Sequence, residues 1–283
     1  MRLLLIFIII PFIMKGQENK DKFTKYFSKY NSFSFDLMRD KNPKYEEIVG
    51  LYQKLEKKDV KEILNHENPI IRVHLIHLLI MEKNIEVDLL EVFNNEVIKS
   101  QSFDYYICFS VWNRSIASFI YNLYRSSLDE IWCVNPMDCQ IKSKRHKHID
   151  LKDKILIDFD HYILQRDSLD YDLYFYAFKN RHYEEKQDDR IIFLAKNNNF
   201  YAFKYLIDNK INFDENKYFS VNFMQAEFKT YDELMYLREY LIYLIEIKND
   251  TKLALEKLRK EQDNWKRYSY LFDELIRRNK LNL

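Results

Sequence analysis

Two histidines three positions apart are the first residues of this sequence that could bind a metal ion. His74 and His77 lie within the stretch HENPIIRVHLIHLLIMEK, residues 66–83. On a helix they would be about 60° apart, so both imidazoles could reach one ion. Glu82 would lie well round the helix from both, and the HExxH pattern of zinc proteases is absent. Because this helix is apolar almost all round, we interpret the two imidazoles as buried and hydrogen-bonded rather than metal-binding.

Residues 133–148 contain a second candidate metal site, in which two thiolates and two imidazoles could bind zinc tetrahedrally. Its members are Cys133, Cys139, His146 and His148. The cysteines are separated by more than the usual two to four residues, and nearby basic side chains repel a cation: Lys142, Lys144, Arg145 and Lys147. We therefore prefer a Cys133–Cys139 disulfide, which would contribute about 2 kcal/mol in the chain-entropy model. Zinc binding and free thiols remain the alternatives.

The other polar clusters are explained more simply by structure than by chemistry. The basic residues 142–148 could contact an anionic partner, but we favour a solvated loop. Cys108 lies in an apolar run and is expected to be an inert buried thiol. A cluster of aspartates between residues 158 and 172 is better explained by helix capping than by catalysis. Its members are Asp158, Asp160, Asp167, Asp170 and Asp172. We assign no catalytic or cofactor-binding residue and expect no cofactor.

Composition excludes several classes of function. The 283 residues include 45 Lys and Arg against 44 Asp and Glu, so no global field favours nucleic acid or an anionic membrane. The chain has two glycines, Gly16 and Gly50. Phosphate-binding loops, the dinucleotide fingerprint and the GxSxG nucleophile elbow all need more glycine than this. Hairpin-rich β folds need glycine as well, so the sequence predicts a mostly helical protein.

The first residues have the order of a secretory signal peptide. Arg2 precedes an apolar run from Leu3 to Met14, and the small residue Gly16 precedes Gln17 and a charged stretch. The run is too short to cross a bilayer, which takes roughly 20 residues. We expect residues 1–16 to be removed and the protein to be periplasmic or secreted, an uncleaved anchor being the alternative. No later run is long enough for a transmembrane segment.

Apolar periodicity predicts one helix after another in two regions, residues 18–127 and 151–283. Residues 128–150 lack this periodicity and are predicted to be a loop or insertion. Further helices are expected near 170–181, 188–196, 200–209 and 231–247, and an apolar stripe from Trp265 to Ile276 predicts a last one. Residues 103–111, rich in aromatic and β-branched side chains, are compatible with a strand or a helix, before a helix from Ser115 to about Ser126.

The segment LNHENPIIRVHLIHLLI resembles the second half of a HEAT-type repeat. In that family a short helix and a polar turn lead into an apolar helix, here with Asn68 and Pro69 at its start and Arg72 after Ile71. The resemblance covers about residues 44–95 and extends to HEAT-like exported bacterial proteins of unassigned activity. It implies an all-α fold, an irregular α-solenoid of HEAT-like helical repeats, and a role as a binding scaffold.

Asparagine-rich turns join apolar helices elsewhere in the chain. Asn suits both helix caps and left-handed backbone positions, so it can replace the missing glycine at helix ends. The turns are unevenly spaced, so they do not demonstrate a regular repeat array. LAKNNNFYAFKYLIDNKINFD, residues 194–214, resembles an ankyrin helix pair. It lacks that family's Thr-Pro-Leu-His entry and turn glycines, and we rank this resemblance below the HEAT-like one.

From these patterns we expect an exported, non-catalytic helical-repeat scaffold that binds a protein or peptide and no nucleic acid. One alternative is a metal-dependent zinc hydrolase that uses residues 133–148 or His74 and His77. A second alternative is a periplasmic inhibitor or immunity-type protein.

Overall fold

The computed structural model describes residues 18–35, 37–38, 42–82, 86–107, 110–128, 153–179 and 181–281. The chain divides into two compact units, residues 1–159 and 160–283, which we treat separately. The predicted loop at 128–150 lies outside the described residues except for Leu128. Within the described ranges, no helix combines the length and apolar character needed to cross a bilayer.

The first unit is built round a buried helix, α4 (Pro69–Glu82), in which every side chain from Ile70 to Ile80 is buried. Its neighbours are α2 (Pro43–Tyr52), α3 (Lys57–Leu64) and α6 (Ile116–Leu128). Residues 18–27 form a further helix, and α5 (Leu89–Lys99) packs on α6. The boundary between the two units falls within α8 (Lys154–Leu164). The expectation of a mostly helical chain is confirmed.

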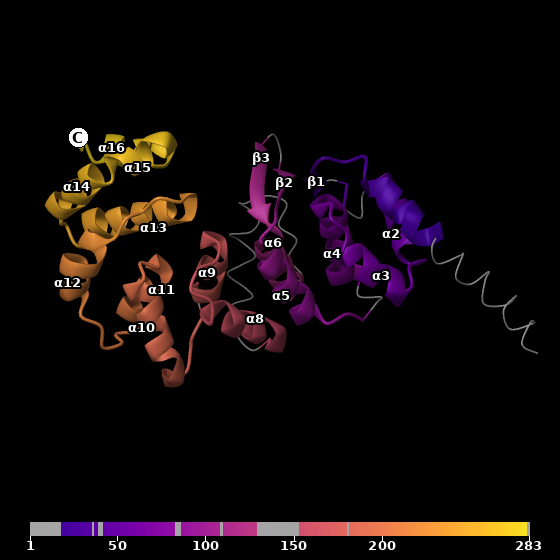
Figure 1. The fold of residues 1–283 in the computed structure, drawn as a ribbon, viewed down its shortest axis with the longest axis horizontal. Coiled ribbons are helices and arrows are strands. Elements are labelled where there is room, and N and C mark those ends of the chain that lie inside the picture. Colours follow the sequence, from indigo (N-terminus) through magenta and orange to yellow (C-terminus); the bar gives the residue numbers. More distant parts are fainter. Residues whose placement is uncertain are drawn as a thin grey trace, which may run out of the picture. The chain divides into compact units, whose positions relative to one another are not determined.

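A small sheet lies beside α4 and α6 (Figure 1). It includes part of the segment 103–111, for which the sequence allowed either a strand or a helix. Strand β2 (Ser102–Ile107) pairs antiparallel with β3 (Ser110–Ser115) and parallel with the short β1 (Phe33–Ser34). Phe103 and Tyr105 are buried, whereas Asp104 and Tyr106 are exposed, the two-residue alternation of a half-buried strand. The described residues of the segment, 103–107 and 110–111, therefore lie in strands, and the next helix begins at Ile116, one residue after the predicted start.

In the second unit, every regular element among the described residues 160–179 and 181–281 is a helix. Helix α11 (Phe200–Asp208) contacts α9 (Tyr171–Phe178), α10 (Asp188–Lys196) and α13 (Tyr231–Ile242). The predicted helices at 188–196, 200–209 and 231–247 are thus confirmed, the last with a π-helical end, η4 (Tyr243–Ile247). Shorter segments complete the unit: η2 (Glu185–Gln187), α12 (Glu215–Lys217), the π-helical η3 (Tyr218–Phe223) and α14 (Thr251–Lys260).

Aromatic rings fill the core of this second unit. The ring of Phe203 lies 5.1 Å from that of Tyr218 and 5.3 Å from that of Tyr240, measured between centroids. Tyr240 in turn contacts Phe223 on η3 at 5.1 Å. Such edge-to-face and offset contacts add to the stabilisation from apolar burial, so the high aromatic content of the sequence is used here to build the core.

Non-glycine residues occupy the left-handed positions at the ends of helices, as the glycine-poor composition requires. Asn198 and Asn249 have φ values of 65° and 56°, which confirms the expectation that Asn replaces glycine there. Ser100, Lys210 and Lys280 adopt the same conformation with φ between 49° and 54°. The chain therefore ends several helices at some cost in backbone strain.

The predicted continuous helix over Trp265–Ile276 is wrong in one respect, because it is broken into three pieces. These are α15 (Gln262–Trp265), the 3₁₀ segment η5 (Lys266–Leu271) and α16 (Asp273–Arg278), and Tyr268 has a non-helical φ of −123°. The rings of Trp265 and Phe272 are 5.4 Å apart. Seven residues of regular α-helix rise about 10.5 Å, so the break brings both rings into one core.

Candidate functional site

The structure places His74 and His77 in the apolar core of the first unit. Their side chains are 0% and 1% exposed. The Nδ1 of His74 lies 2.7 Å from the carbonyl oxygen of Ile70, to which it donates a hydrogen bond. Its ring stacks on Phe27 with a centroid separation of 4.2 Å, and the ring of His77 lies 5.5 Å from that of Phe33. This environment agrees with two imidazoles buried in a packing helix.

Burial also fixes the charge of these imidazoles. Desolvation lowers the pKa of His74 to about 4, partly offset by the hydrogen bond to Ile70. Desolvation and the neighbouring His74 lower the pKa of His77 to about 3. Both side chains are therefore neutral at neutral pH. Among the residues described, no three or more of His, Cys, Asp and Glu are grouped in a way that could hold a metal ion.

The second candidate metal site falls outside the described part of the chain. Cys133, Cys139, His146 and His148 are not among the described residues, and neither is Cys108. The disulfide, the zinc site and the buried thiol therefore stay predictions.

The carboxylates near residue 160 have different roles in the second unit. Asp170 is the residue that precedes α9, as helix capping requires, although its side chain makes no capping hydrogen bond. Asp160 instead lies inside α8 and accepts a 2.6 Å hydrogen bond from Nε of Arg181, and both side chains are buried. Helix capping was therefore the wrong explanation for Asp160, because its nearest charge partner lies 21 residues along the chain.

A buried ion pair that the sequence did not predict joins α4 to α5. The guanidinium of Arg72 meets the carboxylate of Glu96 in two 3.0 Å contacts, Nε to Oε1 and Nη2 to Oε2. Arg72 is 1% exposed and Glu96 is 2% exposed. Lys99 adds a second cation, with its Nζ 3.0 Å from Oε1 of Glu96. Paired geometry of this kind is what allows a charged group to be buried.

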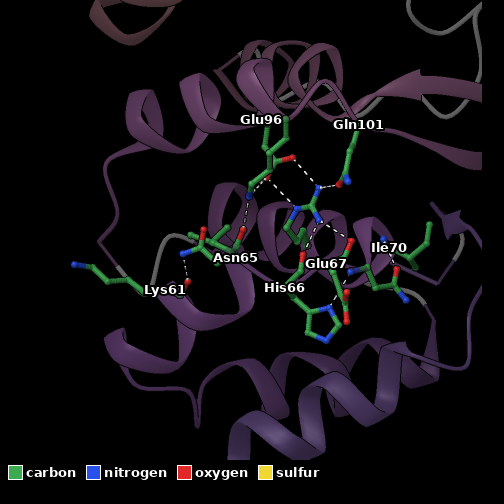
Figure 2. A network of polar contacts seen from close by, with 11 residues as sticks. Lys61, Asn65, His66, Glu67, Ile70, Glu96 and Gln101 are labelled. Atoms are coloured by element: carbon green, nitrogen blue, oxygen red, sulfur yellow. Dashed lines mark hydrogen bonds and ion pairs between the residues drawn. The ribbon is translucent and has the colours of Figure 1, made fainter.

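The other donors of Arg72 hold the turn before α4. Nη1 donates to the carbonyl oxygens of His66 and Glu67 at 2.6 and 3.2 Å, and Nη2 donates to Oε1 of Gln101 at 2.5 Å. Figure 2 shows Glu96 and Gln101 on one side of this network and the His66–Glu67 turn on the other. One arginine thus connects the α3–α4 turn with α5 and with Gln101, two residues beyond the end of that helix.

Asn68 and Pro69 begin α4 as the sequence predicts. Oδ1 of Asn68 accepts a 2.9 Å hydrogen bond from the backbone N–H of Ile70, and Pro69 is the first helical residue. The backbone N–H of Asn68 donates to Nδ1 of His66 at 3.0 Å. The cap therefore fixes the direction in which the chain enters the buried helix.

Replacing Asn68 with alanine is expected to lower the free energy of unfolding by about 1 kcal/mol, because an orphan N–H at the start of α4 loses its acceptor. Replacement with aspartate keeps a side-chain oxygen at the cap and should change stability much less. Urea unfolding followed by circular dichroism measures both effects. Equal destabilisation by the two substitutions would show that the capping oxygen is not what matters at this position.

An open groove of about 500 Å3 lies between α3 and α5, and Glu96 and Lys99 of the Arg72 network are among the residues that line it. Its α3 side is formed by Lys57, Lys61, Leu64 and Asn65. Its other side is formed by α5 and the residues before it: Glu86, Val87, Asp88, Glu91, Val92, Asn95, Glu96 and Lys99. The groove is therefore bounded by the helix that precedes α4 in the chain and the helix that follows it.

The two sides of this groove carry opposite charge. Lys57 and Lys61 are exposed, lie one helical turn apart on α3, and form no ion pair with any other described residue. Glu86, Asp88 and Glu91 are exposed at the start of α5, where acidic groups favour the helix dipole. The carboxylate of Asp88 also accepts hydrogen bonds from the backbone N–H groups of Leu90 and Glu91 at 3.0 and 3.1 Å. Sequence reasoning missed this groove, since its sides come from helices about 30 residues apart.

Comparison of the chain with protein-family models, with curated proteins and with solved structures gave no match.

Proposed function

We propose that the protein is an exported helical-repeat scaffold of the HEAT-like kind that binds a protein or peptide partner and does not act as an enzyme. The observation that carries this proposal is the groove between α3 and α5, which is open, bordered by exposed charges and lined in part by Glu96 and Lys99 of the buried ion-pair network. A volume of about 500 Å3 lies within the usual range for sites that take a small ligand or a short segment of a partner.

The way in which successive helices are joined supports the scaffold part of the proposal. Helices α3 and α4 contact each other across a short polar turn, and α4 contacts α6 in its turn. Arg72 ties that turn to Glu96 on α5. A stacked array of helix pairs needs such links between one pair and the next, because each pair contacts only its neighbours.

Exposed apolar side chains support a macromolecular partner. Ile98 on α5 is 69% exposed, and it lies seven residues after Glu91 on the same side of that helix. Ile98 lies outside the groove lining, on the helix that forms one side of the groove. Protein interfaces commonly combine such apolar anchors with surrounding polar contacts.

Export is supported by the order of charged, apolar and small residues at positions 2–16. Mass spectrometry of the protein from its native cell is expected to find a chain that begins at Gln17. A cytoplasmic protein that still begins at Met1 would contradict this part of the proposal.

Photocrosslinking from the groove tests the binding function. With p-benzoylphenylalanine in place of Asn95, which lines the groove, the protein in its native cell is expected to crosslink to one discrete partner. The same amino acid in place of Lys58 is the matched control, because Lys58 is exposed on α3 but does not line the groove. The partner, once identified, should bind the purified protein at micromolar concentration. Absence of any specific crosslink at either position would contradict the proposal.

A further inference from the structure

The charges that border the α3–α5 groove define the chemistry of what it can hold. Glu96 does not contribute free charge, since Arg72 and Lys99 both contact its carboxylate and its side chain is 1% exposed. The charge of Lys99 is also used within the protein, because its Nζ donates to the carbonyl oxygen of Leu64 at 2.9 Å in addition to contacting Glu96. The charges available to a ligand are therefore the exposed ones on the rim.

Those rim charges are segregated rather than mixed. Lys57 and Lys61 lie on the α3 side, and Glu86, Asp88 and Glu91 lie on the α5 side. A ligand of uniform charge would be attracted by one side and repelled by the other. A phosphate backbone in particular would meet carboxylates along α5, whereas nucleic-acid sites are lined by basic residues. The ligand that fits both sides carries acidic groups along one edge and basic groups along the other.

Between the charged sides the groove offers a small apolar surface. Of the apolar side chains that line it, Val92 is buried, and Leu64 and Val87 are half-buried. An aliphatic side chain between the two charged edges of a ligand would cover this surface. Amphipathic helices in which acidic and basic residues flank an apolar stripe have this arrangement.

We infer that the groove binds a helical segment of a partner protein, with its acidic edge against Lys57 and Lys61, its basic edge against Glu86 and Glu91, and an aliphatic stripe between them. This inference rests on the proposed function and specifies its partner. The charges contribute mainly to the rate of encounter and to the choice of partner, and the apolar stripe contributes the contact area. Binding should weaken as the salt concentration rises, because the rim charges are exposed to solvent.

A set of three designed peptides tests the inference. Each is a capped helix of about 14 residues with the same leucine stripe and carries a fluorescent label. The mixed peptide has glutamates along one edge and lysines along the other, the second peptide has lysines on both edges, and the third has glutamates on both. Fluorescence anisotropy with the full-length protein is expected to show that the mixed peptide binds at least about tenfold more tightly than either uniform peptide.

Charge reversals in the groove should then change the preference in a defined way. In the variant Lys57→Glu/Lys61→Glu both sides are acidic, and the all-lysine peptide should become the preferred one by about tenfold. In Glu86→Lys/Glu91→Lys both sides are basic, and the all-glutamate peptide should be preferred. The control Lys54→Glu/Lys58→Glu makes the same change in net charge at exposed residues outside the groove and should keep the wild-type order.

The outcomes separate this inference from the proposed function. If the partner found by crosslinking binds Lys57→Glu/Lys61→Glu as tightly as the wild type, or if the control variant changes peptide preference as much as the groove variants do, the inference is overturned and the scaffold function stands. Self-association that disappears in Lys57→Glu/Lys61→Glu, measured by sedimentation, would assign the groove to a second copy and overturn it as well. If neither a peptide nor a cellular partner binds, both proposals are overturned.

Discussion

Replacing Arg72 with methionine is expected to lower the free energy of unfolding by about 3 to 5 kcal/mol, the usual cost of removing one member of a buried ion pair. The carboxylate of Glu96, 2% exposed, would be left with Lys99 as its remaining cation. The carbonyl oxygens of His66 and Glu67 would lose their donor at the same time. Urea unfolding gives the total loss, and hydrogen exchange at the amides of α4 and α5 locates it in the first unit.

Two further variants show whether the buried charge is the cause. Lys99 is 29% exposed in its side chain, so Lys99→Met should cost only about 1 kcal/mol. The double variant Arg72→Met/Glu96→Leu removes both opposite charges and should be more stable than Arg72→Met alone, because no carboxylate is then buried beside a missing partner. A double variant that is no more stable than Arg72→Met would contradict this explanation.

Acidification is expected to destabilise the first unit by about 4 kcal/mol between pH 7.5 and pH 5, through His74 and His77 together. Burial lowers the pKa of these side chains to about 4 and about 3, whereas an unfolded histidine titrates near 6.5. Below pH 6.5 the unfolded chain takes up protons that the folded core does not. The stabilisation is therefore complete above the unfolded pKa and is lost as the pH falls toward the folded values, at about 1.4 kcal/mol per histidine and pH unit.

Hydrogen exchange of α4 as a function of pH measures this effect separately from the second unit. There Asp232 acts in the opposite direction, since burial and the neighbouring Asp170 raise its pKa to about 6 and folding therefore becomes less favourable as the pH rises. In His77→Leu the dependence on pH should be roughly half that of the wild type, and in His74→Leu/His77→Leu it should nearly vanish. An unchanged slope in the double variant would show that other groups cause the acid sensitivity.

The elements that the sequence predicts well are those determined by neighbouring residues. Asn68 and Pro69 mark the start of α4 because a capping oxygen and a fixed φ act within one turn of helix. Asn198 and Asn249 take left-handed positions because few other residues tolerate them, and glycine is nearly absent. The apolar surroundings of His74 and His77 were also visible as a run of apolar neighbours along one helix.

What the sequence did not predict depends on residues that meet only after the helices pack. Arg72 was identified as part of a repeat pattern, yet its partner Glu96 lies 24 residues away and has no local signature. The groove likewise needs α3 and α5 side by side. The break near Tyr268 brings Trp265 and Phe272 into one core, and a regular apolar stripe does not reveal such a break.

The pairing of β1 with β2 has a consequence for the order of folding. It joins Phe33 to Tyr105, about 70 residues apart along the chain, whereas α10 and α11 are joined by a turn of a few residues. Contacts between distant residues form late because a long loop must close before they stabilise anything. We therefore expect helix pairs such as α10–α11 to form early and the parallel pairing of β1 to complete the first unit last. Until β1 arrives, that edge of β2 is unpaired and open to another chain.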